Sequence, residues 1–293
     1  NIVLRMYCGP VLDEITKHPA QSSCALGIDP HSVDWADLYN YTNAFKNLIA
    51  GDCKKLESST TASFSEMFTR FIIRGMEFSE TEEVVVSNLL QSLNGFAFIV
   101  NNVVYESWNG HSSGHYCTTV YNSFVVWVAH KIVFRAVYPD LCFEDNVALK
   151  VCGDDSTGGV SAQVPEFNMQ TIAAKFKEFW GIVYTSPNKS EVIPLYVERG
   201  SPDDTFLGRA FVPEGDKVLA PLRLTAIYNL MYWGKDVPGK TREVVKRERF
   251  DMAGREASLH SSVEWEKFLG VARDTRRGQS GIVLKKKKEY KND

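Results

Sequence analysis

The chain has 293 residues, of which 44% are hydrophobic and 24% are charged, and these proportions are typical of a folded globular protein. Its net charge of −3 excludes nucleic-acid binding through overall charge, so an RNA or DNA partner would need a local basic surface. The six cysteines are scattered without a C-x-x-C pair, which favours free thiols over a disulfide framework.

The first predicted elements are a strand and two helices. The run NAFKNLIAGD indicates a strand over 43–52 that ends at its aspartate. Apolar side chains in the stretch 64–72 recur at i, i+3, i+4, i+7 and i+8, which predicts a helix. Ser63 followed by Glu66 predicts a capping box at or near its start. A second helix is predicted over 79–93.

A hairpin and a long helix come next. Residues 96–107 read as two short strands folded at Asn101 and Asn102, which suit a tight turn. A loop is predicted over 108–117, followed by a long apolar helix over 118–137 that a proline closes two residues later.

The remaining pattern is mixed and then helical. The alternating run NVALKVC predicts a strand, a turn with Gly153, Asp154 and Asp155 at its tip, and a returning strand. Further along, the pattern predicts a helix over 167–180, an edge strand and turn over 181–190, a strand over 205–212, and helices from Thr225 onward. An α+β body followed by a helical appendage is the predicted fold class.

Acidic residues stand at the ends of two of these strands. Asp52 closes the first strand, and Asp154 and Asp155 occupy the later turn. If the two strands are neighbours in one sheet, three carboxylates meet and their repulsion needs a cation. Oxygen ligands without histidine or thiolate favour Mg²⁺ or Mn²⁺, and two such ions about 3.5–4 Å apart are the usual clamp for nucleotidyl transfer. The alternative interpretation is a solvated acidic turn.

The order of the surrounding segments carries more information than GDD alone. AGDCKKLESS, SSGHYCTTVYNS, GDD, YTSPNKS and FLGRAF follow one another along the chain. Together they resemble palm motifs A to E of the RNA-dependent RNA polymerases of positive-strand RNA viruses, nearest to the picorna-like group that includes dicistroviruses and iflaviruses. LRMYCG and ALGIDPHSVDW resemble the fingers of that group, and LAPLRLTAIYNLMYW and VEWEKFLG resemble its thumb.

The resemblance implies the polymerase right-hand fold, in which a small antiparallel palm sheet packs on helices beside partial fingers and a helical thumb. It divides the chain into the C-terminal part of the fingers (1–44), a palm segment with motif A (45–78), a fingers insertion (79–106), a palm segment with motifs B to E (107–212), and a thumb with a basic tail (213–293). The basic motif F of the fingers is expected just before Asn1, which has no initiator methionine, so the chain is expected to be a piece of a longer polypeptide that polymerises poorly alone.

The implied activity is template-directed RNA synthesis for viral genome replication and transcription, by a nucleotidyltransferase with two Mg²⁺ or Mn²⁺ ions. By this resemblance Asp52 and Asp154 are the principal metal ligands and Asp155 assists. Lys189 matches the lysine proposed to protonate the departing pyrophosphate, since an ammonium can act as a general acid. Arg209 would lie beside the primer strand.

A second set of residues matches the part of the family pattern that contacts the incoming nucleotide. Ser113 and Asn122, together with the acid at Glu57, would sense the ribose 2′-hydroxyl, which is both donor and acceptor. Thr118 lies one helical turn before Asn122 and would support them, while Gly114 gives the loop freedom to move.

Three residues depart from the family pattern, and the first is Leu56, which stands where an aromatic residue is common. Glu57 replaces the usual aspartate, and a displacement near 1 Å can cost on the order of 10²-fold in rate. Gly208 replaces a usual lysine, which removes a primer-contacting charge. These departures and the expected loss of motif F motivate an alternative, a degenerate or incomplete polymerase that binds RNA without catalysis. A weaker alternative is another palm polymerase such as a reverse transcriptase, although Ser113 and Asn122 favour ribonucleotides.

The implied partners are an RNA template and primer, ribonucleoside triphosphates, a protein primer of the kind common in the group, and other viral replication proteins. The implied location is the host cytoplasm at membrane-associated replication complexes, although no apolar run reaches the roughly 18 residues of a membrane span. The tail run Lys285 to Lys288 favours a solvated end over a nucleic-acid contact. A zinc site at His111, His115 and Cys117 is disfavoured, because the spacing is loose and a fourth ligand is not evident.

Overall fold

The computed structural model describes residues 1–190, 192–233 and 235–276, and the chain divides into two compact units. The first unit spans 1–207 and the second starts at Gly208. The predicted basic tail at Lys285 to Lys288 lies outside the described residues.

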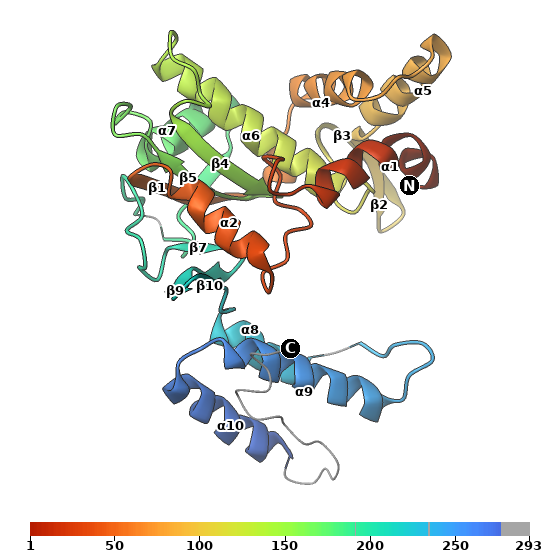
Figure 1. Ribbon diagram of the computed structural model, residues 1–293. Helices are drawn as coiled ribbons and strands as arrows, with labels where there is room; N and C mark the ends of the chain where they lie inside the picture. Colours follow the sequence, from red (N-terminus) through yellow and green to blue (C-terminus); the bar gives the residue numbers. More distant parts are fainter. Residues whose placement is uncertain (191, 234, 277–293) are drawn as a thin grey trace. The chain divides into compact units, whose positions relative to one another are not determined.

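A four-stranded antiparallel sheet forms the centre of the first unit, with the strand order β4-β5-β1-β6 (Figure 1). Its strands are β1 (Asn47–Lys54), β4 (Val147–Cys152), β5 (Asp155–Val160) and β6 (Val183–Thr185). Every residue of β4 before Cys152 is buried, and so are the last five residues of β5. Because successive side chains of a strand point to opposite faces, both faces of these two strands are covered.

Helices supply that cover. The helices of the first unit are α1 (Ile2–Lys17), α2 (Val33–Thr42), α3 (Leu56–Ser59), α4 (Ala62–Arg74), α5 (Glu80–Gln91), α6 (Thr118–Val137) and α7 (Met169–Trp180). The long helix α6 packs against β4, α7 packs against β6, and α2 contacts β4 and β5. α6 is apolar on most of its surface and buries ten residues, as expected for a helix surrounded by protein.

A separate hairpin, β2 (Asn94–Val100) and β3 (Val103–His111), precedes α6. Its turn residues Asn101 and Asn102 have φ angles of 50° and 63°, the left-handed conformation that asparagine tolerates and that two-residue hairpin turns require. The hairpin predicted at these two residues is therefore confirmed. The first unit ends with the short strand β7 (Thr205–Phe206).

The second unit is mainly helical. It contains the short strands β8 (Arg209–Ala210), β9 (Val212–Glu214) and β10 (Lys217–Leu219), followed by the helices α8 (Leu224–Tyr232), α9 (Arg242–Ser258) and α10 (Ser262–Arg276). A hydrophobic core of its own holds the helices together, with Ile227 from α8, Phe250 from α9 and Phe268 from α10 all fully buried. The prediction of helices from Thr225 onward is confirmed for the described residues, which end at Arg276.

Four predicted elements need correction. Ser63 and Glu66 form no capping box, because α4 already begins at Ala62; the capping box of this region joins Ser79 to Glu82 at the start of α5. β1 continues two residues beyond Asp52, because pairing with β6 extends it. β3 runs to His111, into the predicted loop. The strand predicted over 205–212 is interrupted at Leu207 and Gly208, which both have positive φ.

Candidate functional site

The three predicted acidic residues meet at one end of the central sheet. Asp52 on β1 is the register partner of Asp155 on β5. The backbone N–H of Cys53 donates to the carbonyl oxygen of Asp154 at 3.1 Å, so the turn after β4 lies directly beside the end of β1. Residues about a hundred positions apart in the chain are therefore brought together by strand pairing.

The turn that carries Asp154 is held by the helix behind it. Gly153 has a φ of 64°, a conformation that costs glycine little. Its N–H donates to Ser123 Oγ at 2.8 Å, while Ser123 Oγ donates to the Thr119 carbonyl at 2.7 Å within α6. Sequence analysis missed Ser123, which directly follows the predicted site residue Asn122 on α6.

Asp52 is positioned by a close approach of two strands. A Cβ atom on Gly51 would lie 2.2 Å from Tyr184 Cζ and 2.7 Å from the Thr185 carbonyl oxygen, so only glycine fits there. Thr185 is the β6 register partner of Asp52 and donates its hydroxyl to the Asp52 carbonyl at 3.3 Å. The Asp52 side chain is 13% exposed.

Burial and neighbouring charges raise the pKa values of Asp154 and Asp155. Burial, followed by the charges of Asp52 and Asp154, raises the pKa of Asp155 to about 6, against the opposing effects of a hydrogen bond from the Leu207 N–H and of Lys189. The pKa of Asp154 is raised by burial and by the charges of Asp52 and Glu57. Such mutual repulsion is what a bound cation would relieve.

One cation of the chain already lies beside the cluster. Lys189 Nζ is 3.8 Å from Asp52 Oδ2, and its side chain is 64% exposed. The residue has a φ of 61° in the turn after β6, and its N–H donates to the Ser186 carbonyl at 2.8 Å. The predicted general acid is thus within reach of the carboxylates while remaining accessible to solvent.

The donor chemistry fits a hard divalent ion. Burial keeps the pKa values of the neighbouring thiols high, well above the ordinary value for Cys53 and at about 12 for Cys152, so both remain protonated. Among the described residues, no three acidic, histidine or cysteine side chains stand close enough together to hold a metal by themselves. Mg²⁺ ordinarily takes one or two protein carboxylates and completes its shell with water and substrate phosphates, and the acidic cluster suits that role.

Two of the five residues predicted for the ribose site line a second feature, a pocket of roughly 640 Å³. Glu57 on α3 and Ser113 in the loop before α6 both line it. Gly114 has a φ of 93° and no neighbouring atom within 4 Å of a hypothetical Cβ, and its N–H donates to Thr118 Oγ1 at 3.2 Å. Asn122 is buried on α6, with no hydrogen-bond partner for Oδ1.

Arg209 belongs to the second unit and is engaged there. Its two terminal nitrogens each donate to a different oxygen of Glu256 at 2.7 Å, and one also donates to the Ala220 carbonyl at 2.9 Å. Only 14% of its side chain is exposed. A primer contact by this arginine stays a prediction, and it would require Glu256 to share or release the guanidinium.

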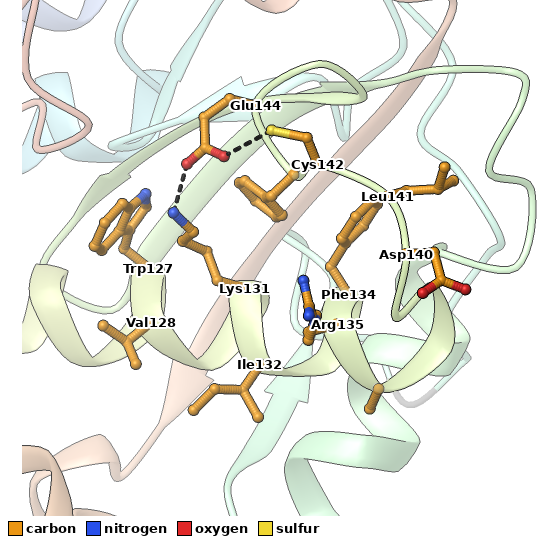
Figure 2. A pocket seen from close by; sticks show the side chains of 12 residues that line it. Trp127, Val128, Lys131, Ile132, Phe134, Arg135, Asp140, Leu141, Cys142 and Glu144 are labelled. Carbon is orange, nitrogen blue, oxygen red and sulfur yellow. Dashed lines mark hydrogen bonds and ion pairs between the residues drawn. The ribbon is translucent and has the colours of Figure 1, made fainter.

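A larger hollow of about 970 Å³ lies along the C-terminal half of α6 and the 140–144 loop, and none of the predicted site residues lines it. Figure 2 shows Glu144 joined to both Lys131 and Cys142 within it. Lys131 Nζ also lies 4.5 Å from the centre of the Trp127 ring. The predicted site residues therefore lie outside this hollow.

Comparison with known proteins assigns the family. The family described as viral RNA-dependent RNA polymerase matches this chain over residues 1–277. The chain belongs to that family. The family prediction from the five motifs is thus confirmed. The predicted α+β polymerase fold is confirmed as well, because the chain is similar in structure to the Sicinivirus 3Dpol RNA-dependent RNA polymerase. The TM-score is 0.80 at 16% sequence identity, and the match covers 98% of this chain and 59% of that one.

Curated relatives of this polymerase chain are long viral polyproteins. It is 26% identical over 272 residues to the RNA1 polyprotein of tomato ringspot virus (isolate raspberry). The aligned segment covers 90% of this chain and 12% of that polyprotein. It is 23% identical over 290 residues to the replicase polyprotein of Drosophila C virus (strain EB), and the aligned segment covers 92% of this chain and 15% of that polyprotein. The polymerase chain thus spans a small part of these relatives. None of its described helices combines the length and apolar content needed to cross a lipid bilayer.

Proposed function

We propose that this chain carries the catalytic centre for template-directed RNA synthesis by two-metal nucleotidyl transfer. The observation that carries the proposal is the pairing of Asp52 with Asp155 beside the Asp154 turn, which gathers three carboxylates at one exposed sheet end. A cluster of raised-pKa carboxylates, with a lysine beside it, is a common sign of a functional site.

In this proposal Asp52 and Asp154 are the principal ligands of two Mg²⁺ or Mn²⁺ ions, and Asp155 assists. When bound, such ions lower the pKa of an attacking hydroxyl and neutralise a leaving pyrophosphate. The chain's own part is to hold the carboxylates in place through Gly51, Ser123 and the strand pairing. Because the cation favours the ionised acids, its binding would lower the pKa of Asp155 from about 6.

Lys189 would donate a proton to the departing pyrophosphate. Its ammonium is held near the acidic cluster by Asp52 but remains exposed, so it can turn toward a bound triphosphate. In the same proposal, Arg209 contacts the primer strand of the RNA.

The ribose of the incoming nucleotide would be sensed at the pocket beside α3. Glu57 and Ser113 supply an acceptor and a hydroxyl on its wall, and Asn122 supplies an amide from α6. Thr118 restrains the Gly114 N–H, so it would limit where the loop can move. A site of this kind favours ribonucleotides because it contacts the 2′-hydroxyl.

The rest of the assignment extends the same proposal to the whole protein. Palm segments over 45–78 and 107–212, fingers over 1–44 and 79–106, and a thumb from 213 would together hold an RNA template and primer. A protein primer and other viral replication proteins would be partners. Synthesis would take place in the host cytoplasm at membrane-associated replication complexes.

The test replaces Asp154 with asparagine in the complete polymerase that contains this chain. Incorporation of ribonucleotides on a primed RNA template should fall by at least about 10²-fold, because a metal ligand is lost. Asp145→Asn, an exposed change just before β4, is the matched control and should retain activity. Circular dichroism should show both variants folded.

Two outcomes would go against the proposal. Full activity of Asp154→Asn would contradict the proposal that Asp154 is a metal ligand. An inactive wild-type polymerase that still binds RNA, and that Glu57→Asp does not activate, would favour the degenerate copy.

A further inference from the structure

His111 lies between the two segments that carry the proposed ribose contacts. It ends β3, its side chain is only 2% exposed, and its Nδ1 is 3.1 Å from Thr60 Oγ1. Thr60 Oγ1 in turn donates to the Glu57 carbonyl oxygen at 3.2 Å. A carbonyl can only accept, so the single hydroxyl proton of Thr60 is directed to Glu57. In that arrangement Thr60 Oγ1 accepts from His111, and the imidazole proton lies on Nδ1.

The backbone fixes this contact. The Gly110 N–H donates to the Thr60 carbonyl at 2.9 Å, and Gly110 has a φ of 84°. A Cβ atom on Gly110 would lie 2.4 Å from the Glu57 carbonyl oxygen, so the end of β3 rests directly on the α3 segment. His111 cannot move away from Thr60 without detaching this strand end.

The other ring nitrogen faces α6. The Asn122 amide is near enough to raise the pKa of His111, but burial outweighs it and lowers the pKa to about 4, so the ring is neutral at pH 7. A neutral ring with its proton on Nδ1 presents a lone pair at Nε2. As placed, Nε2 of His111 and Oδ1 of Asn122 both lack a hydrogen-bond partner of good geometry. A half-turn of the amide would let Asn122 Nδ2–H donate to Nε2 and would free Oδ1.

We propose that His111 is a positioning residue that turns the Asn122 amide so that Oδ1 is available to accept from a ribose 2′-hydroxyl. Through Thr60 the same imidazole ties Asn122 to the main chain of Glu57, so one buried ring aligns both sides of the ribose site. The inference rests on the proposed function, because it takes the pocket lined by Glu57, His111 and Ser113 as the nucleotide site.

The first test does not depend on catalysis. Nitrogen-15 NMR of the histidine rings of this chain at pH 7 should report His111 with its proton on Nδ1. That tautomer is the minor one for a free imidazole, so its dominance would reflect the Thr60 contact. Thr60→Val should shift the balance toward Nε2–H. A dominant Nε2–H tautomer in the wild type would overturn the proposal.

The second test measures nucleotide selection in the complete polymerase. His111→Phe keeps a ring but removes both nitrogens, and it should lower the ratio of kcat/KM for ATP to that for 2′-dATP by about tenfold. The value of kcat/KM for ATP should fall, whereas kcat/KM for 2′-dATP should stay unchanged. His115→Phe, whose ring lies 5.6 Å from that of His111, is the control and should leave the ratio unchanged.

An equal loss for both nucleotides would assign His111 a purely structural role and overturn the proposal. If the wild-type polymerase incorporates neither nucleotide, the proposed function fails, whereas the tautomer measurement still decides whether His111 orients Asn122. The two failures are therefore distinguishable.

Discussion

Asp155 favours the proposed metal binding but destabilises the metal-free fold. Its position opposite Asp52 is needed to gather the acids, yet burial and neighbouring charges raise its pKa to about 6. A carboxyl whose folded pKa lies above its unfolded value of 3.8 contributes stability below pH 3.8. That contribution is lost as the pH rises through about 6. At pH 7.5 the ionised Asp155 therefore destabilises the metal-free fold.

We predict that Asp155→Asn raises the free energy of unfolding at pH 7.5 by about 1–3 kcal/mol. The amide keeps an oxygen for the Leu207 N–H but carries no charge. The difference from wild type should vanish near pH 4, where Asp155 is protonated. Urea unfolding at the two pH values measures this, with Asp145→Asn as a control that should change little. If Asp155→Asn is less stable than the wild type at pH 7.5, repulsion between Asp155 and the neighbouring carboxylates does not dominate its effect on stability.

Added Mg²⁺ gives a related expectation for the same residue. Millimolar Mg²⁺ should raise the unfolding midpoint of the wild type more than that of Asp155→Asn, since a ligand that binds only the folded state stabilises it.

At the scale of elements, the site depends on how closely β1 and β6 approach. Gly51 precedes Asp52, and the Tyr184 ring fills the space that a side chain at Gly51 would need. Tyr184 is held from the other side, because its hydroxyl lies 3.3 Å from Ser156 Oγ on β5. The strands cannot adjust separately, so a change at Gly51 would move Asp52.

Gly51→Ala is predicted to destabilise the protein by about 1–3 kcal/mol and to reduce polymerase activity. The new methyl group would collide with the Tyr184 ring and with the Thr185 backbone. Gly75→Ala is the matched control, because the nearest atoms to its Cβ would be at ordinary contact distances and its φ is −79°. Denaturant unfolding of the two variants tests the claim, which fails if both lose the same stability.

At the scale of the whole molecule, buried neutral histidines set the acid limit of stability. His130 on α6 is fully buried, 5.0 Å from the Phe176 ring, and burial lowers its pKa to about 4. Burial also lowers the pKa of His111 to about 4. A histidine whose folded pKa lies below its unfolded value of 6.5 stabilises the protein above pH 6.5. It loses that effect as the pH falls toward 4.

The free energy of unfolding should therefore fall as the pH drops from 6.5 to about 4, by a few kcal/mol for each such histidine. The raised pKa values of Asp154 and Asp155 act in the opposite sense in this window, but the lowered pKa values of three histidines, His111, His115 and His130, oppose them. His130→Leu should flatten the pH dependence, because it removes a histidine whose pKa burial lowers to about 4. Unfolding curves across this range measure the slopes, and identical slopes for His130→Leu and wild type would contradict the explanation.

The sequence by itself determined what depends on local pattern and on motif order. The helix over 118–137 was located to the residue, because a long apolar run ends at a proline. The hairpin at Asn101 and Asn102 followed from turn chemistry, and the family followed from five motifs in order. The acidic turn was placed correctly at Gly153 and Asp154, but Asp155, predicted at its tip, is the first residue of β5 because it pairs with Cys152 and Asp52.

Only the tertiary structure decided how distant residues meet. Strand register put Asp155 opposite Asp52, and a helix hydroxyl, Ser123, anchored the Gly153 turn. The burial of His111 against Thr60 could not be read from its position, because its neighbours in the chain are polar. The physical reason is that periodicity and turn preference act over a few residues, whereas register, close strand approach and pKa shifts depend on contacts between segments about thirty to a hundred or more residues apart.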